Sequence, residues 1–477
     1  MNEQDISRLV EEVLSRLEFP SGATGPGASV SGSSDDPVFL TVDEAVDCAE
    51  KAQAAFHEMG LEARRRIIES IRQASLRESE RLARMAHEET GMGRWQDKLQ
   101  KNLLVSARTP GVEDLSSRSY TGDKGLTLVE YAPFGVVAAV TPSTNPTATI
   151  ISNAIGMLAA GNSVVFSPHP AARKCSQETV RIINGAILAA GGPFGLVATV
   201  CEPSQESTRQ LLAHPKAGLN VVTGGPAIVK VAMTTGKTCK VIAAGPGNPP
   251  VVVDDTAIFP KCAEDIITGA GFDNGVLCIA EKQVIVQKSA REKLLAGFRK
   301  DPRACELSSG QMDEVTGKAI LEGGRGCRDP RLNREYIGKN ASFIAKAIGL
   351  NISDDIRVLW SEVPNDHPFI WTEQLMPVLP VTTVRDLDTA IELAYQSEGG
   401  NRHTAAMHSM NVENLTRMGR RMACSIYVKN APTLYGLGMG EGYSSMTIGT
   451  PTGDGITKPT HFVRPLHCTL VGYFRIA

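Results

Sequence analysis

A chain of 477 residues with 42% hydrophobic content exceeds what one hydrophobic core usually supports, so we expect at least two domains. The net charge of -3 and the aromatic content of 5% argue against nucleic acid as a partner, because nucleic-acid-binding proteins carry basic surfaces with interleaved aromatic residues. No apolar stretch is long enough to cross a membrane and the polar N-terminus lacks the features of a signal peptide, so we expect a soluble intracellular protein.

Six apolar residues near the N-terminus recur at the spacing of one helix face. They are Ile6, Leu9, Val10, Val13, Leu14 and Leu17. The pattern predicts an amphipathic helix over residues 1–18, and the Gly, Ser and Pro content of residues 19–37 predicts a flexible linker after it. A short helix tethered outside the main domain has no local partner, so we expect it to bind another protein. The alternatives are that it folds back on its own subunit or is disordered.

The folded body is expected to begin at Thr41, because Thr41 and Glu44 have the spacing of a capping box. Residues 126–130 alternate between polar and apolar, and with residues 462–474 they predict strands outside the main sheet. From Gly135 onward, strands alternate with helices, which is typical of a parallel sheet with crossover helices. The expected segments are residues 136–140, 147–160, 163–167, 171–189, 195–200, 206–213, 219–223 and 227–233.

One glycine turn in this region is a candidate for binding a dinucleotide. The sequence contains no G-x-G-x-x-G fingerprint, but Thr223, Gly224 and Gly225 stand between an expected strand and an expected helix. Glycines there let backbone N–H groups and the helix N-terminus approach a pyrophosphate. The same turn is also an ordinary way to connect a strand to a helix.

The ten cysteines are irregularly spaced and form no C-x-x-C pair, which indicates free thiols in a reducing compartment and no metal site. One of them, Cys278, ends a turn of small residues that begins at Gly271. Free cysteine is most often a core residue, but a thiol that follows a tight glycine turn is a candidate nucleophile. The segment resembles the F-x-N-x-G-Q-x-C signature of the aldehyde dehydrogenase superfamily. It is matched by Phe272, Asn274, Gly275 and Cys278, with Val276 in place of the glutamine.

The resemblance extends from about Thr41 to the C-terminus, and it implies an α/β fold with the domain plan of that superfamily. A Rossmann-like dinucleotide-binding domain is expected over residues 38–246, with oligomerisation strands near residues 117–131. A catalytic α/β domain is expected over residues 247–445, and residues 446–477 should return to a β-arm that joins subunits. The expected assembly is a homo-oligomer, either a dimer or a tetramer.

The resemblance also implies roles for three residues. Cys278 corresponds to the nucleophile, and its backbone N–H is expected to help bind the oxyanion. The second donor is expected from a loop that resembles the P-W-N-F-P loop of the family, and within that loop Asn145 is named on chemical grounds. An ungapped match places Thr144 on the family's asparagine, and an Asx turn before Pro146 is the alternative role of Asn145. Glu373 begins a segment that resembles E-x-F-G-P-V-L, whose glutamate holds the nicotinamide ribose.

The segment from Asn162 to His169 resembles the family's G-N-x-V-V-x-K-P-S sequence, which contacts the adenosine ribose. Ser167 replaces the lysine and His169 replaces the serine, so both are predicted cofactor contacts and the choice between NAD and NADP stays open. A lone histidine after a strand also often has a purely structural role.

The residue at position 244 indicates which molecule accepts the acyl group. Hydrolytic members carry a glutamate that activates water in the segment E-L-G-G-K-x-P, whereas this chain has Ala244 at the matching position. An acyl-enzyme without that base should react with a thiol instead, and coenzyme A is the expected thiol. Four further segments resemble CoA-acylating members: residues 167–170, 338–341, 403–405 and 449–453.

With the N-terminal helix, the closest resemblance is to the propionaldehyde and acetaldehyde dehydrogenases of bacterial microcompartments. The expected reaction is oxidation of a short-chain aldehyde with NAD and CoA to an acyl-CoA, which makes the protein an NAD(P)-dependent oxidoreductase. Residues 1–18 are expected to bind a shell protein and place the enzyme in the microcompartment lumen within the cytoplasm. The alternatives are a hydrolytic aldehyde dehydrogenase and a non-catalytic cargo protein. The turn at Gly224 could also serve the diphosphate of CoA.

Overall fold

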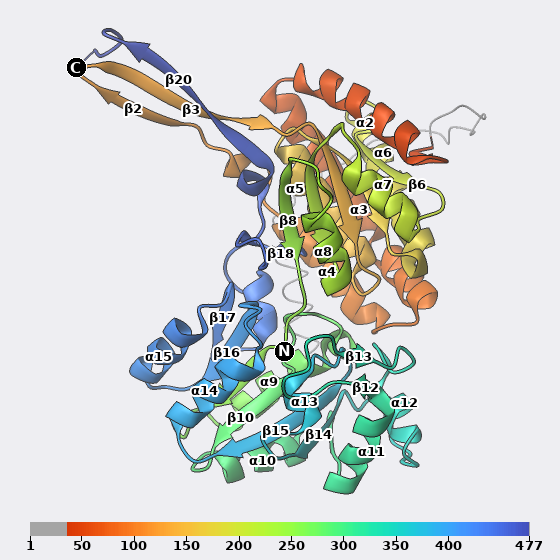
Figure 1. Cartoon of the computed structure of the whole chain (residues 1–477), viewed down its shortest axis with the longest axis vertical. Helices are drawn as coiled ribbons and strands as arrows, with labels where there is room; N and C mark the ends of the chain where they lie inside the picture. The colour runs from red at the N-terminus through yellow and green to blue at the C-terminus, as the bar shows by residue number, and fades with distance from the viewer. Residues whose placement is uncertain (1–35, 477) are drawn as a thin grey trace, which may run out of the picture. The chain divides into compact units, whose positions relative to one another are not determined.

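The computed structural model describes residues 36–476. The first half of this range contains a six-stranded parallel sheet (Figure 1). Its strands are β1 (Val38–Phe39), β4 (Val136–Thr141), β5 (Ser163–Pro168), β6 (Val197–Val200), β7 (Ala217–Thr223) and β8 (Lys240–Ala244). They lie in the order β1-β6-β5-β4-β7-β8. From β4, the chain adds β5 and β6 on one side of the sheet, and it then returns to the other side of β4 to add β7 and β8. In open α/β sheets, ligands bind where the strand order reverses, which here is beyond the carboxyl ends of β4 and β7.

Helices cover both faces of this sheet because alternate residues of its strands point to opposite sides. Val137 and Ala139 of β4 join the core under α3, α4, α5 and α6, whereas Val136 and Ala138 join the core under α2, α7 and α8. The helices are α2 (Val42–His57), α3 (Leu61–Thr90), α4 (Trp95–Arg108), α5 (Pro146–Ala159), α6 (Arg173–Ala189), α7 (Gln205–Ala213) and α8 (Pro226–Met233). The capping box of Thr41 and Glu44 begins α2, as predicted.

A seven-stranded parallel sheet follows, in the order β11-β14-β15-β10-β9-β16-β17. Its strands are β9 (Pro250–Val253), β10 (Gln283–Gln287), β11 (Ala304–Glu306), β14 (Val358–Glu362), β15 (Val378–Val384), β16 (Thr404–His408) and β17 (Ile426–Lys429). The helices around it are α9 (Lys261–Gly271), α10 (Arg291–Lys300), α11 (Ser309–Ala319), α12 (Ala341–Lys346), α13 (Pro368–Trp371), α14 (Leu387–Ser397) and α15 (Val412–Met422). The predicted domain boundary at residues 246 and 247 lies in the loop between β8 and β9.

Three antiparallel strands form a separate sheet, labelled in Figure 1. They are β2 (Arg118–Gly122), β3 (Gly125–Pro133) and β20 (Val463–Val471), and β20 pairs with β3 along its whole length. This confirms the strands predicted outside the main sheet from residues 126–130 and 462–474. Nearly all of β20 is exposed, including Leu466 and Leu470.

Short elements complete the fold. They are β12 (Ile320–Glu322), β13 (Arg331–Leu332), β18 (Ile448–Gly449), β19 (Gly455–Ile456), η1 (Val112–Asp114), η2 (Pro170–Ala172), η3 (Phe272–Gly275), η4 (Thr433–Leu437) and η5 (Pro459–Phe462). The helix predicted over residues 171–189 begins later than expected, because Pro170 starts a separate 3-10 turn that His169 caps. No helix among residues 36–476 is long and apolar enough to cross a membrane. The predicted helix over residues 1–18 and almost all of the predicted linker lie outside the described residues.

Candidate active site

The turn that precedes Cys278 has an unusual backbone. Asp273, Asn274 and Gly275 follow one another with φ values of 46°, 56° and 69°, in the left-handed region. A residue other than glycine costs about 1–2 kcal/mol in this conformation. Surrounding contacts must therefore hold the turn, and these come from apolar packing on one side and a buried ionic network on the other.

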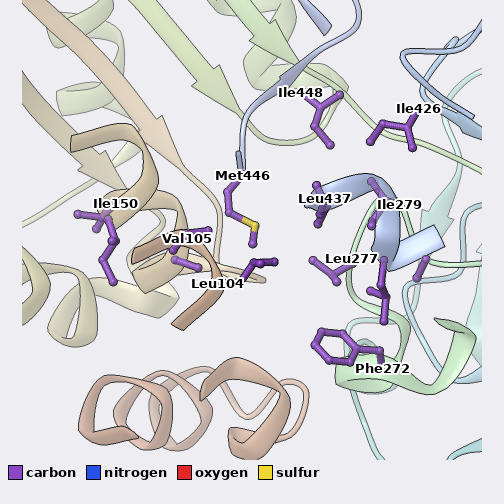
Figure 2. Packing of buried hydrophobic residues seen from close by; sticks show 14 of the residues in the cluster. Leu104, Val105, Ile150, Phe272, Leu277, Ile279, Ile426, Leu437, Met446 and Ile448 are labelled. Carbon is purple, nitrogen blue, oxygen red and sulfur yellow. The ribbon is translucent and has the colours of Figure 1, made fainter. Parts of the chain in front are cut away.

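Apolar side chains anchor the turn to the core. Phe272, Leu277 and Ile279 are all at most 5% exposed and belong to one continuous cluster. Figure 2 shows them together with Leu437 of η4 and Met446, a residue from the segment that follows η4. Because Cys278 stands between two of these anchors, its backbone is fixed while its side chain stays half-buried.

The ionic network surrounds the fully buried carboxylate of Asp273. One oxygen accepts hydrogen bonds from the ammonium groups of Lys98, at 3.1 Å, and of Lys101. The other accepts the backbone N–H of Arg94 at 2.8 Å. Burial alone would raise the pKa of Asp273, but Lys101 and Lys98 hold it below its usual value. The carboxylate is therefore charged, and it links the turn to α4.

The side chain of Asn274 also holds the turn. Its Oδ1 accepts from Arg94 Nε at 3.1 Å, and its Nδ2 donates to the carbonyl of Gly338 at 2.9 Å and to Asn340 Oδ1 at 2.8 Å. Both of its amide hydrogens are therefore used by the protein, and its oxygen accepts one hydrogen bond. Asn274 thus stabilises the backbone that presents Cys278.

The thiol of Cys278 lies near two buried charges. The pKa of Cys278 is raised to about 12, mainly by burial and secondly by Glu373, while Lys282 opposes both effects. Lys282 is 1% exposed, and its ammonium donates to the carbonyl of Gly275. No sequence pattern indicated a role for Lys282, although it stands four residues after Cys278.

Gly247 lies against both Cys278 and His403, a residue to which no sequence pattern assigned a role. A Cβ atom on Gly247 would lie 2.7 Å from the carbonyl oxygen of Cys278 and 3.0 Å from Cγ of His403, so only glycine fits without movement. His403 is fully buried, and burial with some repulsion from Lys282 lowers its pKa to about 4. Its Nδ1 bonds to Thr404 Oγ1 at 2.9 Å, while its Nε2 has no partner within residues 36–476. The imidazole is therefore neutral, with one nitrogen available.

Glu373, the residue predicted to hold the nicotinamide ribose, is joined to Gly247 and lies within the electrostatic reach of Cys278. Gly247 donates a backbone hydrogen bond to its carboxylate, and Oε1 has no hydrogen-bond partner in the described part of the chain. Burial raises the pKa of Glu373 to about 7, although Lys282 opposes the shift. A carboxylate with a free oxygen is suited to accept hydroxyl groups such as those of a ribose.

Asn145 is joined to the cysteine turn through Lys101. Its Oδ1 accepts from Lys101 Nζ, the same ammonium that binds Asp273, and its Nδ2 donates to Thr144 Oγ1 at 3.1 Å. Asn145 stands at the N-cap of α5, but its side chain makes no capping bond there. The structure therefore shows a contact with α4 where the alternative interpretation expected an Asx turn.

The glycine turn lies where the strand order reverses. Thr223 ends β7, and its hydroxyl bonds to Thr447 Oγ1 at 3.1 Å. The N–H of Gly224 donates to the carbonyl of Ala244 at 3.2 Å, and the exposed Gly225 is the N-cap of α8. The N-terminus of α8 is accessible for a phosphate group, which fits the predicted dinucleotide contact.

The other two predicted cofactor residues stand at the carboxyl end of β5. Ser167 is 1% exposed, and its hydroxyl bonds to Thr208 Oγ1 at 2.7 Å inside the core, so it does not face the surface. His169 is exposed, and its Nδ1 accepts the N–H of Ala171 at 3.1 Å as the cap of η2. No hydrogen bond in the described chain joins either residue to the Cys278 turn. Their cofactor contacts stay predictions.

Comparison with known proteins agrees with the resemblance found in the segment around Cys278. A family model described as the aldehyde dehydrogenase family matches residues 39–325. The acetaldehyde dehydrogenase (acetylating) EutE of Salmonella typhimurium is 47% identical over 481 residues, covering 100% of both proteins.

Two solved structures share the fold. Rhodopseudomonas palustris propionaldehyde dehydrogenase with bound propionyl-CoA has a TM-score of 0.88 and 45% identity, over 92% of this chain and 96% of that one. A second structure of that enzyme holds CoA and an acylated cysteine. A propionaldehyde dehydrogenase from the Clostridium phytofermentans fucose utilisation bacterial microcompartment has a TM-score of 0.89 and 40% identity, over 92% of this chain and 100% of that one.

Proposed function

The chain belongs to the aldehyde dehydrogenase family, and on that premise we propose that it is a CoA-acylating aldehyde dehydrogenase. It oxidises a short-chain aldehyde, propionaldehyde or acetaldehyde, with NAD or NADP, and it transfers the acyl group to CoA. The observation that carries the proposal is the turn at Cys278. It presents a half-buried thiol beside Lys282, Glu373 and His403, whereas Ala244 supplies no carboxylate to activate water.

In the first step, the sulfur of Cys278 attacks the aldehyde carbon, and the carbonyl oxygen becomes an oxyanion. The backbone N–H of Cys278 and Nδ2 of Asn145 are the donors for that oxyanion, and such donors are commonly the largest single contribution to acyl-transfer rates. Lys282 supplies the positive charge that favours the thiolate form of Cys278. A nicotinamide held at this site would supply the hydride acceptor, and once the substrate carbon has lost its hydride, the oxyanion would collapse to a thioester on Cys278.

The residues present fit a dinucleotide. Glu373 offers an unpartnered carboxylate oxygen for ribose hydroxyls, and the N-terminus of α8 at Gly225 offers N–H groups for phosphate. The predicted contacts of Ser167 and His169 with the adenosine ribose belong to the same proposal. His169 has an accessible ring, whereas Ser167 would have to give up its bond to Thr208.

In the second step, the thiolate of CoA attacks the thioester carbonyl, and the thiolate of Cys278 leaves. His403 is positioned to accept the proton of the incoming thiol, because its neutral ring has an unpartnered Nε2 and packs against Gly247 beside Cys278. Water is a poorer competitor, since the methyl group of Ala244 at the end of β8 cannot remove its proton. The products are an acyl-CoA and the reduced nicotinamide.

Rapid-kinetic measurement of NADH formation tests this proposal. Without CoA, we expect a burst no larger than the number of active sites and slow turnover afterwards; with CoA, turnover is sustained. Cys278→Ala should abolish both phases, because loss of a nucleophile costs several orders of magnitude in rate. Cys201→Ala, which removes a half-buried thiol outside the site, is the matched control. Fast, sustained release of free acid without CoA would show a hydrolytic enzyme instead.

The proposal extends to assembly and location. The exposed apolar residues of β20 support a homo-oligomer, a dimer or a tetramer, that forms through the sheet of β2, β3 and β20. The apolar stripe predicted in residues 1–18 supports docking on a shell protein. The similarity to an enzyme from a Clostridium phytofermentans microcompartment supports a location in a microcompartment lumen within the cytoplasm.

A further inference from the structure

Two buried lysines on α4 contact both the turn before Cys278 and the loop that contains Asn145. Lys98 and Lys101 are three residues apart and therefore lie on one face of the helix, and each is 2% exposed. Both ammonium groups bind Asp273 in the turn of Cys278. Each also binds the loop after β4, but at different atoms.

The difference between these contacts has a chemical consequence. Lys98 donates to the backbone carbonyl of Thr144 at 3.1 Å, which does not constrain any side chain. Lys101 donates to Oδ1 of the Asn145 side chain. Because an ammonium has donors only, this contact requires the amide oxygen to face Lys101 and the amide nitrogen to face away from it.

The orientation leaves one donor for the substrate. Nδ2 of Asn145 carries two hydrogens, and one of them bonds to Thr144 Oγ1 at 3.1 Å. No second partner of Nδ2 occurs within the part of the chain that the structure describes. The remaining N–H is free to bind a carbonyl oxygen. Without Lys101, rotation of the amide by half a turn would present an acceptor to the oxyanion.

We propose that Lys101 is a positioning residue for the oxyanion donor: anchored on Asp273, it holds the amide of Asn145 with its N–H toward the substrate carbonyl. It acts through Asn145 and does not touch the substrate. The inference rests on the proposed function, because it assigns a partner to the oxyanion donor of that reaction. It also explains why a lysine is buried beside another lysine, an arrangement that burial and mutual repulsion disfavour.

A double-mutant cycle on full-length enzyme tests the inference with two readouts. The first is the rate constant of the NADH burst, which requires an oxyanion. The second is alkylation of Cys278 by iodoacetamide, a displacement reaction that forms no oxyanion. Removal of one oxyanion donor typically costs about 10²–10³ in rate. We therefore expect Asn145→Ala to slow the burst about a hundredfold and Lys101→Met at least tenfold, while alkylation stays within about twofold.

The cycle separates positioning from general support of the turn. In the Asn145→Ala background, Lys101→Met should cost nothing further, whereas Lys98→Met should have the same effect in both backgrounds. Lys101→Arg, which keeps charge and donors, should restore part of the burst rate. If Lys101→Met does not fold, Lys101→Gln, which has no charge, takes its place in the cycle with the same expected results.

Two results would overturn the inference. One is an equal loss from Lys101→Met in both backgrounds; the other is a parallel loss of alkylation, which would show that Lys101 only supports the turn. An unaltered burst in Asn145→Ala would also reject the inference while the proposed reaction still stands. Failure of the reaction itself is distinguishable, since Cys278→Ala would then retain activity.

Discussion

Replacing Glu373 by glutamine should make the thiol of Cys278 more reactive, even though it removes a conspicuous residue of the site. The carboxylate is, after burial, the largest cause of the raised thiol pKa, and Lys282 opposes it more weakly. Without Glu373, Lys282 loses a partner that favours its charged form. The thiol pKa falls whether or not Lys282 keeps its charge. If Lys282 stays charged, it lowers the thiol pKa without opposition from Glu373. If Lys282 becomes neutral, the thiol loses the larger raising effect of Glu373 together with the smaller lowering effect of Lys282.

The magnitude follows from the pKa values. With a wild-type thiol pKa of about 12, alkylation of neither protein should reach a plateau between pH 6 and 10. The rate should rise about tenfold per pH unit in Glu373→Gln, and less steeply in the wild type between pH 6 and 9, where the ionising Glu373 raises the thiol pKa. The pKa of Glu373 is about 7, so the carboxylate is mostly neutral at pH 6 and charged at pH 9. We expect Glu373→Gln to match the wild type at pH 6. At pH 9 it should react about tenfold faster, which corresponds to about one pKa unit, or 1.4 kcal/mol.

The assay is alkylation of the native enzyme with iodoacetamide, quantified by mass spectrometry of the peptide that contains Cys278. The peptide of Cys201 is an internal control, because that thiol lies outside the site and should respond equally in both proteins. A plateau near pH 7 in the wild type would refute the reasoning, since it would show a thiolate already stabilised. Slower alkylation of the variant at pH 9 would refute it as well.

The remaining predictions concern stability and location. Gly93→Ala should destabilise the fold by about 1–3 kcal/mol in urea unfolding, because a methyl group there would overlap the Asp273 carboxylate and φ is 70°; unchanged stability would mean that the turn can move. Burial is the main cause that lowers the pKa of His408 to about 3. The unfolded chain therefore binds more protons than the folded one, and the free energy of unfolding should fall as the pH drops from about 6.5 toward 3. His408→Gln should flatten this decline in urea titrations at pH 7 and pH 5, and an equally steep decline would assign the effect to other groups. Deletion of residues 1–36 should leave kinetic constants within about twofold while abolishing co-purification with shells, and Leu9→Glu should have the same effect; loss of activity would place the segment in the folded body.

Much of this protein follows from local signals in its sequence. The alternation of strands and helices over residues 136–233 matches the observed elements to within two residues at every end, because period-2 and period-3.6 patterns reflect which face of an element is buried. The capping box at Thr41 depends on residues three positions apart, so it needs no knowledge of distant contacts. The signature around Cys278 can also be recognised from consecutive residues, although distant contacts hold the backbone of its turn.

The electrostatics of the site depend on contacts that no local pattern contains. Lys101 stands 172 residues before Asp273, and in the sequence it is one basic residue of a helix that would ordinarily face solvent. His403 stands more than a hundred residues after Cys278, and only the packing of both against Gly247 brings them together. The amino-acid sequence alone determined which groups can ionise, donate or attack. The tertiary structure decided which of them are removed from water and which charges they face, because the pKa and orientation of a side chain depend on its neighbours in space.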